Sequence, residues 1–227
     1  MSPASNFSMR VFYLTKAKYA LLNIMERHLK VARFSELNDP FELLGVDRSL
    51  KHHRSELKLF RKKTNALTGL LCFGRTWDNP VMWGHYADSH RGICLGFEVP
   101  RRHLKKVFYA KNLTQIRVEL NSTGPLLNRA AKGKLLCTKF HDWNYEKEWR
   151  LLVKLKACKK DESGLHFLGF SHALKLCSVV LGPRCKEEIG AVRRLTKVLD
   201  PEIDVIKARL AYQSFRVVTN IAATKSS

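Results

Sequence analysis

The sequence predicts an α+β fold, a single domain in which helices flank a mixed central β-sheet. Apolar runs of strand length recur along the chain, and segments with helical spacing of apolar residues lie between them. No internal repeat or low-complexity linker divides the 227 residues, and a chain of this length can bury a substantial core. We expect one domain over residues 1–227, with a core from about residue 10 to residue 218 and short flexible tails.

The expected strands are short runs, rich in β-branched and aromatic residues, that end at turn-forming residues. They cover residues 10–15, 29–34, 70–73, 92–99, 107–109, 144–156, 178–181, 203–210 and 215–218, and the last two form a terminal hairpin. The run 92–99 is almost entirely apolar, which favours a central strand buried on both faces. Asn38, Asp39 and Pro40 follow the second strand and end it, because Asn and Asp favour turns and proline lacks an amide donor.

The expected helices cover residues 17–28, 48–65, 80–91, 125–136 and 187–199. The third begins after an Asx cap, with Pro80 in its first turn, and ends before Gly92. The segment 48–65 is very basic and has apolar positions at Leu50, Leu57 and Phe60. This pattern predicts a surface helix with a cationic face.

The charge of the chain points to a polyanionic partner. Forty-one Lys and Arg residues against 20 Asp and Glu residues give a formal net charge of +21, spread through most of the chain. Nucleic acid is the first partner to consider. The residues expected to bind its phosphates are Lys51, Arg61, Lys62, Lys63, Arg101, Arg102, Lys105 and Lys106. A signal-peptide core and an apolar run of about 18 residues are both absent, so we expect a cytoplasmic protein without a membrane partner.

The six cysteines are widely spaced, lie mostly in apolar runs and form no C-x-x-C pair. We expect them to be reduced core residues rather than disulfides. A zinc site from Cys177 and Cys185 with a histidine is an alternative, but a separation of eight residues is not a typical ligand spacing.

In the segment Asn144–Val153, two glutamates and an arginine alternate with Tyr145, Lys147, Trp149 and Leu151. Side chains of a strand alternate between faces, so Glu146, Glu148 and Arg150 would share one face. Carboxylates two positions apart lie about 7 Å from each other and repel when buried, and an arginine beside them stabilises their charge. The alternative is a solvent-facing strand with an ordinary Glu–Arg pair.

A second polar set lies within the expected helix 80–91. Helical spacing would place His85 beside Asp88, and a carboxylate that fixes an imidazole tautomer suits a general base or a metal ligand. His90 would extend this set to three possible metal ligands. The alternative is that Trp83 and Tyr86 anchor the core and that His85 is a satisfied polar group.

Both segments place polar groups on an apolar scaffold, where buried charges need partners. The turn 34–42 adds hydroxyl, amide and carboxylate groups at a strand end, a position that often carries function. We therefore expect a shared cleft lined by Glu146, Glu148 and at least one of His85, Tyr86 and Asp88.

Three motifs occur in a fixed order: L-N-D-P-F-E at 37–42, M-W-G-H-Y-A-D-S-H-R-G-I-C-L-G-F at 82–97 and W-N-Y-E-K-E-W-R-L at 143–151. On these motifs the chain, from Phe12 to Val218, resembles a bacterial family of unknown function, domain-of-unknown-function family 2971. The resemblance implies a toxin-like or phage-defence role directed at nucleic acid.

A second, fold-level resemblance is to ADP-ribosyltransferases, through the strand-helix-strand opening and the late E-x-E motif. It implies NAD as cofactor, with Glu148 holding the nicotinamide ribose and stabilising an oxocarbenium-like transition state. Glu146 would contact the acceptor. By the same resemblance, Arg10 or Tyr13 would contact NAD from the first strand, and Ser35 from the second.

The leading hypothesis is an ADP-ribosyltransferase-like enzyme that uses NAD and modifies or binds nucleic acid. Its candidate catalytic residues are Glu148, Glu146, His85 and Asp88, and its candidate cofactor-binding residues are Arg10, Tyr13, Ser35, Tyr86 and Arg150. A non-catalytic nucleic-acid-binding module is the alternative from another class. A metal-dependent nuclease that uses His85, Asp88 and His90 is a third hypothesis.

Overall fold

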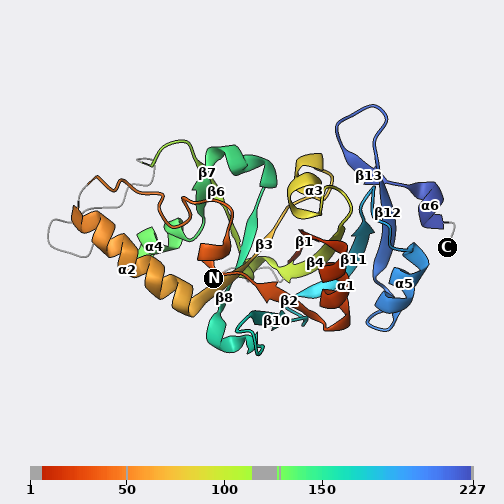
Figure 1. The fold of residues 1–227 in the computed structure, drawn as a ribbon, viewed down its shortest axis with the longest axis horizontal. Coiled ribbons are helices and arrows are strands. Elements are labelled where there is room, and N and C mark those ends of the chain that lie inside the picture. Colours follow the sequence, from red (N-terminus) through yellow and green to blue (C-terminus); the bar gives the residue numbers. More distant parts are fainter. Residues whose placement is uncertain (1–6, 50, 114–126, 128, 226–227) are drawn as a thin grey trace.

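The computed structural model describes residues 7–49, 51–113, 127 and 129–225, and it has the expected α+β fold (Figure 1). The helices are α1 (Ala17–Met25), α2 (Lys51–Leu67), α3 (Pro80–Tyr86), α4 (Arg129–Leu135), α5 (Ile189–Lys197) and α6 (Ile221–Lys225). The strands are β1 (Ser8–Thr15), β2 (His28–Val31), β3 (Thr68–Phe73), β4 (Ile93–Pro100), β5 (Leu104–Lys106), β6 (Phe108–Ala110), β7 (Thr138–Phe140), β8 (Trp149–Lys154), β9 (Lys159–Lys160), β10 (His166–Gly169), β11 (Lys175–Leu181), β12 (Asp204–Leu210) and β13 (Val217–Thr219).

A five-stranded sheet with the order β1-β4-β11-β12-β13 forms the centre of the fold. β11 and β12 are parallel and are connected through α5, whereas the other neighbours are antiparallel. The sheet is therefore mixed, as expected. β4 lies between β1 and β11, and its side chains Ile93, Leu95 and Phe97 are completely buried. The prediction of a central strand at 92–99 is confirmed.

Helices cover both faces of this sheet. Leu95 of β4 packs in one apolar cluster with Ile24 of α1 and Val192 of α5. Its neighbour Cys94 points to the opposite face and packs in a second cluster with Trp83 of α3. This division follows from the alternation of side chains along a strand.

Smaller sheets with the orders β3-β8-β5, β2-β10-β9 and β6-β7 extend the fold from the central sheet. The amide of Phe12 in β1 donates to the carbonyl of Gly74, directly after β3, at 3.0 Å. The amide of Ala32, directly after β2, donates to the carbonyl of Leu70 in β3, also at 3.0 Å. β3 pairs with β8 along its whole length, so these bonds set β8 beside the central sheet.

Helix α2 lies at one end of the molecule, beside α4 (Figure 1). Leu57 of α2 is buried against Leu135 of α4, while Lys62 and Lys63 are exposed. The surface helix with a cationic face is confirmed for the described residues, to which Leu50 does not belong. The expected helix 125–136 corresponds to α4, and residues 125, 126 and 128 of that range lie outside the described residues.

The start of α3 is as predicted. The side chain of Asn79 accepts a hydrogen bond from the amide of Val81 at 2.9 Å, and Pro80 occupies the first turn. Gly92 is required where β4 begins, because a Cβ atom there would lie 2.2 Å from the carbonyl oxygen of Thr15.

The predicted end of this helix is wrong. α3 ends at Tyr86, and Asp88, Ser89 and His90 have φ values of 48°, 51° and 72°. This left-handed conformation cannot continue a right-handed helix. The helical spacing that would place Asp88 beside His85 is therefore absent.

The predicted strand 144–156 is wrong in its first part. Residues His141–Glu146 form a 3-10 helix, η4, and Lys147 follows with a left-handed φ of 44°. β8 begins only at Trp149, so strand alternation does not relate Glu146 to Glu148. The expected tail after residue 218 is also corrected, because residues 221–225 form α6.

All six cysteines are free thiols, and each is buried or partly buried, as expected for reduced core residues. Within the described ranges, the helices are too short or too polar to cross a membrane.

Candidate active site

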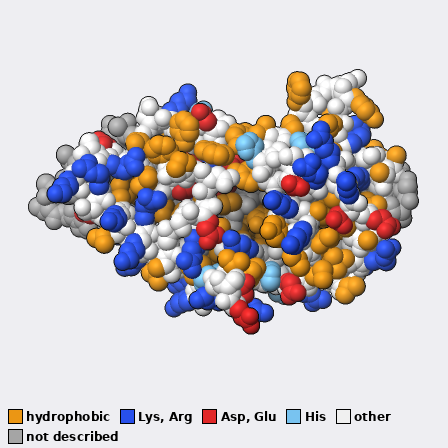
Figure 2. All heavy atoms as spheres, viewed as in Figure 1, with side chains coloured by type: hydrophobic (Ala, Val, Ile, Leu, Met, Phe, Trp, Pro, Cys, Tyr) orange, Lys and Arg blue, Asp and Glu red, His pale blue; other side chains and the backbone are white. Residues whose placement is uncertain are grey.

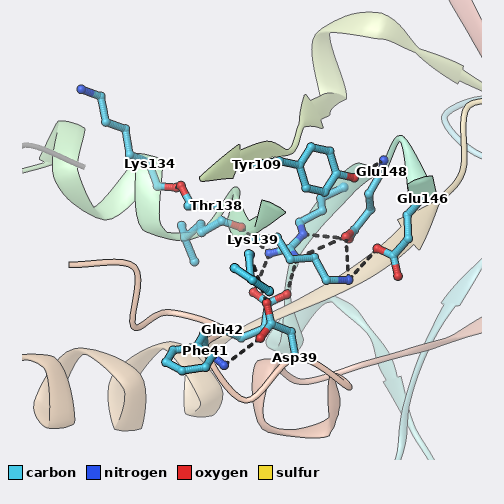
Figure 3. Close-up of polar contacts among 12 residues, drawn as sticks. Asp39, Phe41, Glu42, Tyr109, Lys134, Thr138, Lys139, Glu146 and Glu148 are labelled. Atoms are coloured by element: carbon cyan, nitrogen blue, oxygen red, sulfur yellow. Dashed lines mark hydrogen bonds and ion pairs between the residues drawn. The ribbon is translucent and has the colours of Figure 1, made fainter. Parts of the chain in front are cut away.

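Arg150 of β8 is the centre of a buried ion-pair network (Figure 3). Its side chain is completely buried, and its Nε donates to Glu148 Oε1 at 2.8 Å. Its Nη1 donates to Glu42 Oε2 at 3.0 Å and to the carbonyl oxygen of Leu136 at 2.8 Å. The alternative of a solvent-facing Glu–Arg pair is therefore wrong.

Lys139 of β7 extends the network to the second glutamate. Its buried Nζ donates to Glu146 Oε2 at 2.6 Å and to Glu148 Oε2 at 3.4 Å. The hydroxyl of Tyr86 donates to the other oxygen of Glu146. The hydroxyl of Tyr109 accepts a hydrogen bond from the amide of Glu148 at 2.8 Å. The two glutamates thus share one ammonium group and are held by contacts from three other segments, α3, β6 and β7.

The turn 37–42 is fixed at the same place. Asp39 is 2% exposed, and its carboxylate accepts from the amide of Phe41 at 2.9 Å and from the amide of Phe140 at 3.3 Å. This anchors the turn to the end of β7 and positions Glu42 on Arg150. The three segments that the sequence singled out therefore converge on one network.

The environment separates the pKa values of the two glutamates. Burial raises the pKa of Glu146, and the Lys139 ammonium opposes this only in part. Burial also acts on Glu148, but the Arg150 guanidinium and the Lys139 ammonium outweigh it and lower the pKa to about 2. Burial raises the pKa of Glu42 as well, despite the adjacent Arg150. Glu148 is thus ionised at all ordinary pH values, whereas Glu146 keeps a proton to higher pH.

A cleft of about 430 Å³ opens beside this network. Its volume lies in the range of roughly 300–1,000 Å³ that is usual for small-molecule sites. The cleft lining includes Tyr13, Asn38, Cys72, His85, Tyr86, Lys139, Glu146 and Glu148. The expectation that the two glutamates share a cleft with at least one residue of the 85–88 segment is confirmed.

Aromatic rings follow one another from the cleft to the surface. The rings of His85 and Tyr86 lie 6.2 Å apart, those of His85 and Tyr145 6.1 Å, and those of Tyr145 and Trp143 6.1 Å. The Nζ of Lys139 lies 4.7 Å from the centre of the Trp143 ring. Of these rings, His85 and Tyr86 line the cleft and offer aromatic faces to a planar ligand.

Some of the expected site residues lie away from the cleft. Asp88 is exposed and forms an ion pair with Arg91 at 3.3 Å. Arg10 is exposed and pairs with Glu98 at 3.4 Å. Neither Asp88 nor Arg10 lines the cleft.

Of the remaining candidate residues, Tyr13 lines the cleft, whereas Ser35 and Arg150 do not. Ser35 is exposed outside the cleft lining, and its amide donates to the side chain of Asn65 at 3.1 Å. Arg150 lies enclosed behind Glu148, so it supports the site and does not reach a bound cofactor. Tyr13 of β1 does line the cleft, and burial raises its pKa to about 12.

Sequence reasoning missed two members of the network. Glu42 belongs to the L-N-D-P-F-E motif, so the motif was noticed but the charged partner was not assigned. Lys139 lies in a basic stretch where nothing distinguishes it from its neighbours. The sequence placed two glutamates and only one arginine on one face, and the uncompensated negative charge was the available signal for a further cation.

The described part of the chain contains no group of three or more His, Cys, Asp or Glu side chains that could hold a metal ion. His85, Asp88 and His90 therefore do not form the ligand set that the nuclease hypothesis requires. The zinc alternative at Cys177 and Cys185 has no such ligand set either.

The expected nucleic-acid contacts lie in two places. One is α2, where Lys51, Lys62 and Lys63 are exposed and Arg61 is half-buried. The other is the segment 101–106, the 3-10 helix before β5 together with β5, where Arg101, Arg102, Lys105 and Lys106 are exposed. Figure 2 shows further lysine and arginine side chains scattered over the face in view, between hydrophobic and uncharged areas.

Residues 82–151 match a family model described as "Protein of unknown function (DUF2971)". The matched segment runs from α3 to β8 and contains Tyr86, Lys139, Glu146, Glu148 and Arg150. No curated protein and no solved structure matches the chain, so the resemblance to ADP-ribosyltransferases has no counterpart in these comparisons.

Proposed function

We propose that the chain is an enzyme that cleaves the bond between nicotinamide and ribose in NAD and transfers the ADP-ribosyl group, with the 430 Å³ cleft as its active site. The observation that carries the proposal is the pair Glu146 and Glu148, which share one cleft and one lysine while their pKa values shift in opposite directions. In many active sites two carboxylates have separated pKa values, and one transfers a proton while the other stays ionised and stabilises charge.

Glu148 is the electrostatic member of the pair. Loss of nicotinamide leaves positive charge on the ribose, and a fixed carboxylate beside the ribose stabilises that charge. Arg150 and Lys139 keep Glu148 ionised and fix its orientation. This preorganisation means that the group does not have to reorient during the reaction.

Glu146 is the proton acceptor in this scheme. The nucleophile that attacks the ribose, water or an acceptor hydroxyl, loses a proton, and a carboxylate with a raised pKa is suited to accept it. Tyr86 and Lys139 hold the two oxygens of Glu146 at the cleft wall. His85 and Tyr86 line the cleft and supply aromatic faces for the nicotinamide or adenine ring.

The scheme predicts a specific pH dependence. Glu146 must be ionised to accept a proton and its pKa is raised, so turnover should increase as pH rises through this raised value and then level off. Glu146→Gln should remove the rising limb and leave a low rate that does not vary with pH over that range. Initial rates of nicotinamide release across pH measure both. A rising limb that persists in Glu146→Gln would assign the titration to another group.

A second candidate function is nucleic-acid binding, which the net charge of +21 and the exposed cations of α2 favour. If binding is the whole function, Glu146, Glu148 and Arg150 stabilise the fold without catalysis. Nucleic-acid binding can also accompany the NAD reaction, because a nucleic acid is a suitable acceptor for an ADP-ribosyl group.

Replacing Arg61, Lys62 and Lys63 of α2 by glutamine is expected to weaken binding to all nucleic-acid sequences about equally, because phosphate contacts carry little base information. For duplex DNA, the slope of log affinity against log salt should decrease by about 3, one unit for each lost phosphate contact. Filter binding across a salt series measures both effects.

The matched control replaces Lys156, Lys159 and Lys160, which are exposed around β9, and removes the same charge from another surface. Equal losses of nucleic-acid affinity in the two triple variants would show that total charge, and not the face of α2, determines binding.

A further inference from the structure

We propose that the loop between β12 and β13 is a base-stacking element that binds single-stranded nucleic acid beside the cleft. The loop, residues 211–216, projects from the end of the central sheet (Figure 1). The inference rests on the nucleic-acid partner proposed above and adds the form of that partner and the place where its bases bind.

Two aromatic side chains of this loop are almost fully exposed. Phe215 is 99% exposed and Tyr212 is 89% exposed, more than any other large hydrophobic side chain in the described residues. The strands that carry the loop are hydrogen-bonded to each other. The amide of Ala211 donates to the carbonyl of Arg216 at 2.9 Å, and Leu210 pairs with Val217. The rings are thus presented at the end of a hydrogen-bonded hairpin, and they do not contribute to the core.

The charge around these rings fits a polyanion. Arg209 and Arg216 flank the loop. Arg216 forms an ion pair with the Asp78 carboxylate, whereas Arg209 donates to the neutral carbonyl oxygen of Leu210, so the positive charge beside the rings comes mainly from Arg209. The guanidinium carbon of Arg209 lies 4.3 Å from the centre of the Tyr212 ring. Single-strand binding proteins combine exposed aromatic rings with nearby cations, because the rings stack on bases and the cations contact phosphates. A purely apolar partner would not use this charge.

The hairpin is joined to the wall of the cleft. The amide of Val217 donates to the carbonyl of Asp78 at 2.9 Å, and Arg216 Nε donates to the Asp78 carboxylate at 2.9 Å. Asp78 precedes Asn79, the N-cap residue of α3, and this helix carries His85 and Tyr86 into the cleft. Val217 also packs in one apolar cluster with Met82 and Trp83 of α3. A strand stacked on the loop would therefore lie on the α3 side of the cleft.

The test compares the affinity of the full chain for labelled oligo-dT and oligo-U with its affinity for a duplex of equal length, by fluorescence anisotropy. The double variant Tyr212→Ala/Phe215→Ala should lose about fivefold to a hundredfold in single-strand affinity for each ring removed. Duplex affinity should change little, because its bases are already stacked on each other. The control Phe108→Ala removes another exposed ring, on β6, and should leave both affinities unchanged.

Substitutions that preserve different properties of Phe215 separate stacking from general hydrophobic contact. Phe215→Trp should keep the single-strand affinity of the wild type, because tryptophan also stacks on bases. Phe215→Leu should lose as much affinity as Phe215→Ala, because leucine is apolar but cannot stack. Single-strand affinity that is unchanged in the double variant, or fully kept by Phe215→Leu, would overturn the proposal. The latter result would instead indicate a protein or lipid partner.

The outcome is independent of the NAD reaction. Oligonucleotide affinity is measured without NAD, so a chain that fails to release nicotinamide can still confirm the hairpin site. Conversely, nicotinamide release without an acceptor should be the same in Tyr212→Ala/Phe215→Ala as in wild type. Loss of single-strand binding alone therefore tests the hairpin, and loss of nicotinamide release alone tests the cleft.

Discussion

Replacement of Arg150 by methionine is expected to lower the free energy of unfolding by about 3–5 kcal/mol, the cost of removing one partner from a buried ion pair. Arg150 is completely buried and bonds both Glu148 and Glu42. Methionine fills similar space but leaves two carboxylates buried beside only the ammonium of Lys139. Urea unfolding at neutral pH measures the difference.

Arg10→Met is the matched control, because it makes the same substitution in an exposed ion pair with Glu98. Such a surface pair contributes at most about 1 kcal/mol. Lowering the pH toward 4 should reduce the difference in the free energy of unfolding between Arg150→Met and wild type. The reason is that the unpaired carboxylates of the variant become protonated. Equal stability losses for the two arginine variants would show that the buried network does not determine the stability of the fold.

Glu148→Gln is expected to reduce nicotinamide release by a hundredfold or more, in line with the loss of other preorganised electrostatic groups. Glutamine keeps the size of the side chain and one acceptor oxygen but lacks the charge that stabilises the ribosyl cation. The substitution also leaves Arg150 with Glu42 as its remaining carboxylate partner. A stability loss therefore accompanies the rate loss, and circular dichroism at the assay temperature must show a folded variant.

Glu42→Gln separates the two effects. It is the same chemical change in a carboxylate that also binds Arg150, but Glu42 does not line the cleft. Its stability loss should resemble that of Glu148→Gln, while most of the turnover remains. If both variants lost turnover in proportion to their stability, the rate effect of Glu148→Gln would have a structural cause.

The parts of the fold that the sequence predicted correctly depend on local signals. The nearly apolar run 92–99 favoured a central strand buried on both faces, and Asn79 with Pro80 identified the start of α3. The ends of elements were less predictable. The left-handed residues 88–90 and Lys147 break a helix and a strand whose side-chain patterns continue past them, because tertiary contacts outweigh local preference there.

The site was predictable as a set of segments but not as a network. The E-x-E pair and the 85–86 pair were identified from residue type, and the structure places them in one cleft. Their partners Glu42 and Lys139 come from distant positions in the chain, and a contact such as Arg150 with Glu42, 108 residues apart, has no local signal. The expectation that Glu146 and Glu148 share a strand face led to the right pair for the wrong reason, because Lys139, and not strand alternation, brings their carboxylates together.

The measurement that tests the central claim most directly is nicotinamide release from NAD by the wild-type chain, alone and with single-stranded RNA, single-stranded DNA or protein as acceptor. The account predicts release above the buffer rate, reduced a hundredfold or more by Glu148→Gln and largely retained by Glu42→Gln. No release above buffer with any acceptor would contradict the account, and nucleic-acid binding would then remain as the proposed function.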